Sequence, residues 1–321
     1  MTGLDVFHLT PGQPVADGVR AVAKDQLDSA LTDIDADGVD LHESVHEARK
    51  RCKKVRALVR LVRDGVPDTY DEVNTELRDI ARLVSAERDA AAFVETHDAL
   101  TDALGKDTLA PFTDVRAQLV AHRDGDVLEG IAKLLPEVRE RLATVRWQVD
   151  GWELPDGDGI DVLRAGYERT YDRARTRWSA ATDEATSEHW HEWRKRVKYN
   201  RYHVNLLQEA FPEVMEQRED LLHDLTDLLG DDHDLAELRR ALLHDGLLDL
   251  AEDALTAYVA LLDGQRTRLQ HAALPLATRL YGQPAGEHAD QVFAWWRLAV
   301  DDGRDAAVDA DDLEPVIPHG S

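Results

Sequence analysis

A histidine-led set of cationic residues occurs twice in this chain with the same spacing. In each set an arginine, a lysine and a second arginine follow the histidine by three, seven and ten residues, and the second set lies 145 residues after the first. The sets are His46, Arg49, Lys53 and Arg56, and then His191, Arg194, Lys198 and Arg201. Guanidinium groups bind phosphate through paired hydrogen bonds, an ammonium adds a point charge, and a nearby phosphate favours the charged form of histidine. The pattern therefore predicts a site for a linear polyanion.

These cations stand out because the rest of the chain is acidic. The 321 residues include 64 Asp and Glu against 38 Lys and Arg, which gives a net charge of −26. Residues 49–63 nevertheless hold eight cations and no acid. Like charges one turn apart destabilise a helix by roughly 0.2–0.5 kcal/mol per pair. A solvated basic face, or pairing with acids on neighbouring helices, would explain one such run, whereas its repetition favours a bound polyanion.

Both sets fall on one face of a predicted helix. With about 100° of rotation per residue, the cations of residues 46–63 share one sector and the apolar residues share the opposite sector. Lys50 and Arg60 join the cationic sector of the first copy, and Lys195 joins that of the second. The residues expected to face the core are Val45, Cys52, Val55, Val59 and Val62, and in the second copy Trp190, Trp193, Val197, Val204 and Leu207.

The elements that carry these faces are predicted to be long antiparallel helices. Apolar residues recur at helical spacing through most of the chain, and strand signals are almost absent. Turn residues such as Gly, Pro and Asp-Gly pairs separate the periodic segments. The predicted helical segments are 15–34, 41–62, 73–84, 128–145, 160–181, 190–211, 214–229 and 247–262. We therefore expect an all-α fold.

The two sets belong to a longer internal duplication. The same 145-residue offset relates Lys24 to Arg169 and Leu83 to Leu228, and it crosses a segment rich in Gly, Asp and Pro at residues 150–159. We therefore expect two similar helical bundles, one at about 14–148 and one at about 160–298, joined by a linker at 149–159. The acidic residues 301–321 are expected to form a disordered tail.

Composition argues against several classes of protein. No stretch approaches eighteen consecutive apolar residues, and the first residues lack the basic-then-apolar pattern of a signal peptide, so we expect neither a membrane span nor secretion. Cys52 is the single cysteine, which excludes an internal disulfide and fits a reducing cytoplasm. The acidic, lysine-poor composition is typical of a halophile's cytoplasmic protein, although an ordinary acidic protein can share it.

Several motifs together resemble the CHAD domain, the conserved histidine α-helical domain. The paired stretches are HEARKRCKKVRALVRL and HEWRKRVKYNRYHVNLL, and the flanking ones are GYERTYDRARTRW at 166–178, LLGDDHDLAEL at 228–238 and RLYGQPAGEHADQVFAWWR at 279–297. The resemblance covers about 14–298. Two departures concern the L-G-x-x-R-D pattern that follows each set, where Ser85 replaces the glycine in the first copy and His233 replaces the arginine in the second.

The resemblance implies two tandem antiparallel four-helix bundles related by pseudo-twofold symmetry. It also implies a central groove or pore that binds inorganic polyphosphate without catalysis, with no metal or cofactor. The protein would then be cytoplasmic and associated with polyphosphate granules. The implied ligands are the two histidine-led sets together with Lys50 and Lys195, and the second-tier candidates are Lys24, Arg169, Arg20 and Arg173.

Two rival interpretations involve chemistry rather than binding alone. His46 and His191 are candidate phosphoacceptors, but no Ser/His/Asp grouping or phosphate-binding glycine loop accompanies them. His223, Asp227 and Asp231 follow one another at four-residue intervals, a spacing that can ligate a divalent ion. The first copy has Arg78, Arg82 and Ala86 at the equivalent positions, so an acidic surface face is the favoured explanation. We therefore expect neither an enzyme nor a metal site.

Nucleic acid is the third rival, since it too is a phosphate polymer. Sites for single strands interleave aromatic residues with cations so that bases can stack. Tyr199 and Tyr202 flank the second set, whereas the first set has no aromatic residue. A ligand without bases is therefore favoured, and protein partners cannot be read from the sequence.

Overall fold

Helices account for all the regular secondary structure in the described part of the chain, as the sequence predicts. The computed structural model describes residues 7–35, 41–84, 86–123, 127–154 and 159–311. The first half contains α1 (Val15–Asp35), α2 (Leu41–Leu61), α3 (Pro67–Leu83), α4 (Ala86–Leu104), α5 (Lys106–Leu109), α6 (Thr113–Arg123) and α7 (Val127–Gln148). The second half contains α8 (Ile160–Asp183), α9 (Ser187–Leu206), α10 (Pro212–His244), α11 (Glu252–Tyr281) and α12 (Ala285–Asp311).

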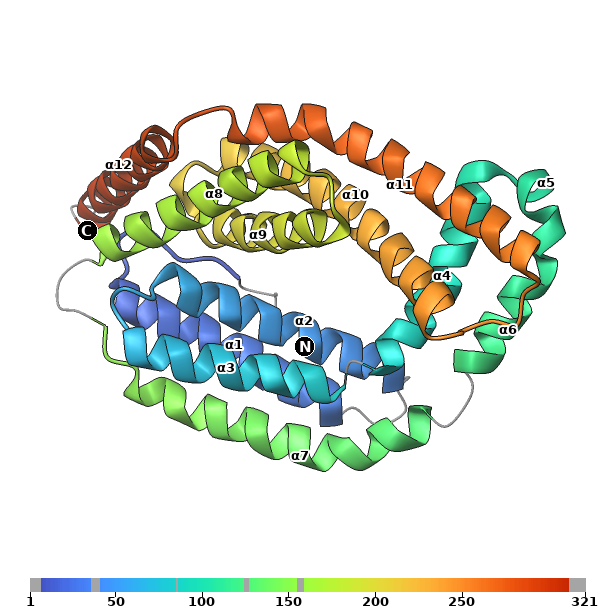
Figure 1. Cartoon of the computed structure of the whole chain (residues 1–321). Helices are drawn as coiled ribbons and strands as arrows, with labels where there is room; N and C mark the ends of the chain where they lie inside the picture. Colours follow the sequence, from blue (N-terminus) through green and yellow to red (C-terminus); the bar gives the residue numbers. More distant parts are fainter. Residues whose placement is uncertain (1–6, 36–40, 85, 124–126, 155–158, 312–321) are drawn as a thin grey trace, which may run out of the picture.

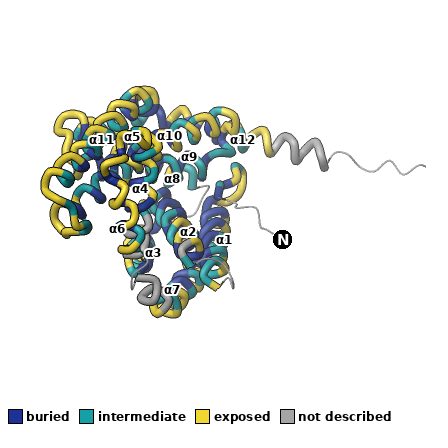
Figure 2. The backbone as a smooth tube through the Cα atoms, turned by 90° about the vertical axis from the view of Figure 1, so that its right-hand side faces the viewer, coloured by how far each residue is buried: buried dark blue, intermediate teal, exposed yellow. Residues whose placement is uncertain are grey.

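Helices α2 and α9 lie side by side through the middle of the molecule (Figure 1). Helices α1 and α3 pack against α2, and α7 packs against α1 and α3. In the second half α8 and α10 pack against α9, and α11 packs mainly against α10. Towards the ends of the two central helices, the His203 Nε2 of α9 lies 2.9 Å from the Ala57 carbonyl oxygen of α2. Figure 2 shows that the buried segments gather where the helices face one another, while the outer turns of α11 are exposed.

The apolar faces predicted for α2 and α9 are buried, which confirms that part of the sequence analysis. Val45, Cys52, Val55, Val59 and Val62 are each at most 4% exposed. The same limit holds for the predicted face of α9, which consists of Trp190, Trp193, Val197, Val204 and Leu207. Both faces belong to one large core that also takes in residues of α1, α3, α7, α8, α10, α11 and α12. This core fixes the rotation of α2 and α9, and so it fixes where their cations point.

A glycine brings α8 close against the end of α2. A Cβ atom added at Gly166 would lie 1.7 Å from the carbonyl oxygen of Leu61. No side chain fits in that space. The close approach presents the residues of α8 one and two turns after Gly166 to the last turn of α2.

A second, smaller core lies where α4 and α6 pack against α10 and α11. It contains Phe93 and Val115 of the first half together with Leu238 and Tyr258 of the second. His97 Nδ1 and the Tyr258 hydroxyl are 2.8 Å apart and join α4 to α11. Residues 86–123 were expected to belong to the first bundle, yet their core is shared with the second half. Helical periodicity marks an apolar face without saying which neighbour will cover it.

The predicted boundaries can be compared with the observed ones at the linker and at the tail. Residues 149–151 form a short 3₁₀ turn, and α8 begins at Ile160 after Gly159, which has a φ of 68°. Residues 155–158 of the predicted linker lie outside the described residues. Helix α12 continues through Asp311, so it extends into the segment expected to be a tail, and residues 312–321 also lie outside the described part. None of the described helices is both long and apolar enough to cross a membrane.

Candidate functional site

A cavity of about 710 Å³ lies between α2 and α9, with further walls from α3, α4 and α10. Its lining includes the eight residues of the two histidine-led sets, together with Lys50 and Lys195. From α2 these are His46, Arg49, Lys50, Lys53 and Arg56, and from α9 they are His191, Arg194, Lys195, Lys198 and Arg201. We call the five residues from each helix a stripe. The two stripes are 145 residues apart in sequence and yet face one space. The ends of the two helices meet, since His203 near the end of α9 contacts Ala57 near the end of α2.

The lining carries a large excess of positive charge. Among the described residues it contains eleven Lys and Arg side chains and three carboxylates, those of Glu219, Asp234 and Glu237. Four further basic residues line the cavity that were not predicted from the sequence, namely Lys54, Arg78, Arg82 and His233. Arg78 and Arg82 stand one helical turn apart on α3, and that spacing is the signal that could have found them.

Hydrogen bonds and burial fix the α2 side of the cavity. The Arg49 guanidinium donates to the carbonyl oxygen of Ala81 on α3. Arg56 Nε donates to Asn74 Oδ1 at 3.2 Å. Burial lowers the pKa of Arg56, and repulsion from Arg60 and Arg78 lowers it further. An anion in the cavity would relieve both effects, because it replaces lost hydration and offsets the repulsion.

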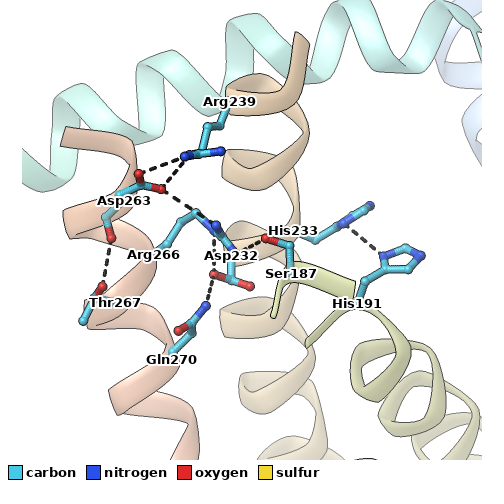
Figure 3. Close-up of polar contacts among 9 residues, drawn as sticks. All are labelled: Ser187, His191, Asp232, His233, Arg239, Asp263, Arg266, Thr267 and Gln270. Carbon is cyan, nitrogen blue, oxygen red and sulfur yellow. Dashed lines mark hydrogen bonds and ion pairs between the residues drawn. The ribbon is translucent and has the colours of Figure 1, made fainter. Parts of the chain in front are cut away.

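An ion pair and a histidine contact tie the α9 side of the cavity to α10. Arg201 Nε donates to Glu219 Oε1 of α10 at 2.7 Å. His191 Nδ1 lies 3.0 Å from His233 Nδ1 of α10, and their ring centroids are 4.2 Å apart (Figure 3). Burial lowers the pKa of His233 to about 3, with repulsion from Arg194 next in size. The pKa of His191 is also lowered, by burial first and by Lys195 and Arg194 after it.

A buried ion pair behind the histidines holds α9, α10 and α11 together (Figure 3). Asp232 of α10 is 2% exposed, and it accepts hydrogen bonds from Arg266 Nε at 3.1 Å and Gln270 Nε2 at 2.8 Å. Arg266 Nη2 also donates to Ser187 Oγ, at the start of α9, at 3.0 Å. Because Asp232 and His233 are adjacent, these contacts position the α10 turn that carries His233 next to the α9 turn that carries His191.

The charge pattern, the two histidine-led helices and the all-α fold together point to one family. The family model of the CHAD domain matches residues 21–243 of the chain. The chain belongs to the CHAD domain family. A search of the curated proteins found no match to it.

Four other cations proposed as ligands of this CHAD domain lie outside the cavity lining. Lys24 forms an ion pair with Asp150. Arg20 Nη1 donates to the Trp152 carbonyl oxygen at 2.9 Å, and its Nη2 pairs with Asp17 at 2.6 Å. Arg169 pairs with Asp64, at 2.8 Å between Nη1 and Oδ1, and Arg173 lies on the same face of α8. The repeat relates Lys24 to Arg169, but neither lines the space that the histidine-led sets share.

Two remaining sequence features also have defined positions in the CHAD domain. His223 Nδ1 lies 3.1 Å from Asp227 Oδ2, and Asp231 follows one turn later on α10. The described residues contain no group of three or more His, Cys, Asp or Glu side chains arranged to hold a metal ion. His233 lines the cavity, whereas Ser85, the other departure from the family pattern, lies outside the described residues.

Proposed function

We propose that this CHAD protein binds inorganic polyphosphate in the cavity between α2 and α9. The observation that carries the proposal is the convergence of both histidine-led stripes on one space of about 710 Å³. The family is associated with polyphosphate in general terms, and the lining supplies the chemistry for it. Arginine forks and lysine ammonium groups suit an unbranched chain with a negative charge on every unit.

The proposal includes a duplicated architecture, in which each stripe comes from one of two similar bundles. Helices α1 and α8 begin at Val15 and Ile160, which are 145 residues apart, as are the two histidine-led sets. Helices α3 and α10 begin at Pro67 and Pro212, again 145 residues apart. Matched starts and matched cationic faces support a pseudo-twofold relation, with the ligand between the two halves.

The aromatic residues of the cavity favour a ligand without bases. The Tyr199 ring is covered by the Arg60 guanidinium, 4.2 Å from the ring centroid. The Tyr202 ring meets Phe7 edge to face at 5.9 Å, and the Lys54 ammonium lies 4.9 Å from the Phe7 ring centroid. These contacts use ring faces that stacked bases would need. We therefore favour polyphosphate over RNA and single-stranded DNA as the ligand.

We also propose binding without turnover. A phospho-accepting imidazole is normally oriented by a carboxylate that accepts from its second nitrogen. In this protein the Nδ1 of His191 meets the Nδ1 of His233. The pair is suited to holding a phosphate oxygen once it is protonated. The same proposal places the protein in the cytoplasm, where phosphate chains collect into granules.

The experiment that tests the function is a titration of the purified protein with polyphosphate, RNA and pyrophosphate at high potassium chloride. Wild type is compared with the double variant Arg49→Ala/Arg194→Ala, which removes one guanidinium from each stripe. We expect the variant to lose roughly a hundredfold in polyphosphate affinity, because a hydrogen bond to a charged group contributes about 1.5–3 kcal/mol.

The matched control is Arg116→Ala/Arg139→Ala, which makes the same change in net charge away from the cavity. Both arginines are exposed and pair with surface carboxylates, Asp98 and Asp35. We expect this control to bind as wild type does. Equal binding by the Arg49→Ala/Arg194→Ala variant contradicts the site, preference for RNA contradicts the ligand, and release of orthophosphate contradicts binding without turnover.

A further inference from the structure

A second group of arginines lies beyond the end of the cavity, where α8 crosses α2. Gly166, Arg169 and Arg173 share one face of α8, and Gly166 packs against the last turn of α2. Arg60 follows Arg56 by four residues along α2, and Arg63 comes two residues after the end of that helix. Together with Arg196 of α9 they form what we call the arginine cluster, which consists of Arg60, Arg63, Arg169, Arg173 and Arg196.

A shared carboxylate, Asp64, and mutual repulsion between guanidinium groups both indicate that arginines of the cluster lie near one another. The pKa of Arg173 is lowered, by burial first and then by repulsion from the other four arginines of the cluster. Asp64 pairs with Arg169 and lies 3.8 Å from Arg63 Nε, and Glu192 lies 3.4 Å from Arg196 Nη2. Arg173 itself has no ion pair among the described residues and is exposed. The cluster therefore keeps an excess of positive charge that faces solvent.

Ring contacts and a shared acceptor fix the arginines of α2 and connect them to the cavity. The Arg60 guanidinium lies 4.2 Å from the Tyr199 ring centroid and 5.4 Å from that of Tyr70, and Arg63 lies 4.9 Å from Tyr70. Arg60 Nη2 and Arg56 Nε both donate to Asn74 Oδ1, at 3.2 Å each. Since Arg56 and Tyr199 line the cavity, a continuous row of guanidinium groups runs from the cavity to the cluster.

Three of the five arginines in the cluster are not part of the repeated pattern. At the 145-residue offset, Asn205 corresponds to Arg60, Gln208 to Arg63 and Asp28 to Arg173. The equivalent position in the other half therefore keeps two cations, Lys24 and Arg51, but lacks these three. A ligand that extends out of the cavity therefore meets the larger group of arginines on the side of the cluster.

We propose that the arginine cluster is a second phosphate subsite, which binds the part of a polyphosphate chain that extends beyond the cavity. This inference rests on the proposed function. From Arg49 to Arg60 the α2 row is about 16 Å long, at 1.5 Å per residue. A short phosphate oligomer held in the cavity does not reach the cluster, whereas a long chain does. The cluster thus gives the protein a preference for long chains, and it gives the bound chain one direction of exit.

The test compares tripolyphosphate with a long polyphosphate on wild type, Arg63→Ala/Arg173→Ala and the control Arg116→Ala/Arg139→Ala. Neither Arg63 nor Arg173 lines the cavity. We expect the Arg63→Ala/Arg173→Ala protein to lose at least about tenfold in affinity for the long chain, as expected for lost hydrogen bonds to charged groups, and to bind tripolyphosphate as wild type does. Arg173→Glu, a single change at an exposed position, should show the same selective loss even if the double variant unfolds.

The outcomes separate the two proposals. Wild type that binds neither phosphate species contradicts the proposed function itself. Wild-type binding with unchanged long-chain affinity in Arg63→Ala/Arg173→Ala and Arg173→Glu contradicts the second subsite alone. An equal loss for tripolyphosphate and the long chain also contradicts it, because the cluster would then act on the cavity rather than on the extended chain.

Discussion

Polyphosphate binding should be coupled to protonation of the histidine pair. Burial and the neighbouring cations hold the pKa of His233 at about 3 and lower that of His191, so both rings are neutral near pH 7 in the free protein. A phosphate oxygen within hydrogen-bonding distance favours the charged ring and raises its pKa. Binding should therefore take up protons, and affinity should rise as the pH falls.

The size of the effect follows from the pKa values. If the anion returns the pKa of His233 from about 3 to about 6.5, its ordinary value, affinity rises about tenfold between pH 7.5 and pH 5.5, or about 1.4 kcal/mol. A second protonation on His191 would raise this gain further. The pH dependence of folding stability has the opposite sign in the absence of ligand. Below about pH 6.5 the unfolded chain binds more protons than the folded protein, so the lowered histidine pKa values make the free protein less stable as the pH falls.

Calorimetric titration in two buffers with different ionisation enthalpies measures the proton uptake directly. His233→Gln provides the comparison, because an amide can still contact His191 but does not titrate. Titration of the ligand's own end groups is common to both proteins and cancels in the difference. We expect less proton uptake and a flatter pH profile in the variant. Identical pH profiles for the two proteins would refute the coupling.

Three further predictions concern stability and salt. Gly166→Ala should lower the free energy of unfolding by about 1–3 kcal/mol, because its Cβ overlaps the Leu61 carbonyl oxygen. Urea unfolding measures the change. Helix propensity alone would raise the urea midpoint, and such a rise would contradict the close packing of α8 on α2. Arg266→Met should cost about 3–5 kcal/mol near neutral pH by leaving Asp232 buried without its ion pair. The destabilisation should be smaller at acid pH, because burial raises the pKa of Asp232 and a protonated carboxyl needs no cation. A destabilisation that does not change with pH would mean that the charge of Asp232 is not its cause. Finally, the logarithm of polyphosphate affinity should fall linearly with the logarithm of salt concentration, and Arg49→Ala should make the slope shallower by about 0.7–0.9; equal slopes would mean that Arg49 contacts no phosphate.

The sequence predicts the all-α fold and the orientation of the two central helices because both depend on local periodicity. One face of α2 is apolar from Val45 to Val62, and burial of that face leaves the cations with one direction to point. The placement of α4 and α6 on α10 and α11 depends instead on contacts between residues far apart in sequence, such as His97 with Tyr258. No periodicity encodes such a pairing.

The predicted ligands that line the cavity are those that belong both to the 145-residue repeat and to the cationic face of α2 or α9. The repeat alone also selected Lys24 and Arg169. Lys24 pairs with Asp150 and Arg169 with Asp64, and neither carboxylate lines the cavity. His233 was missed as a lining residue because its contact with His191 joins two helices. Matches in sequence identify candidates, and long-range partners decide which of them share a space.

The central claim is that the two stripes form one site, and the stoichiometry of binding tests it most directly. Calorimetric titration with a short polyphosphate should give one ligand per chain for wild type, for Arg49→Ala and for Arg194→Ala, with lower affinity in both variants. Two ligands per wild-type chain, with each variant losing one and binding the other normally, would mean that the stripes act separately and would contradict the account.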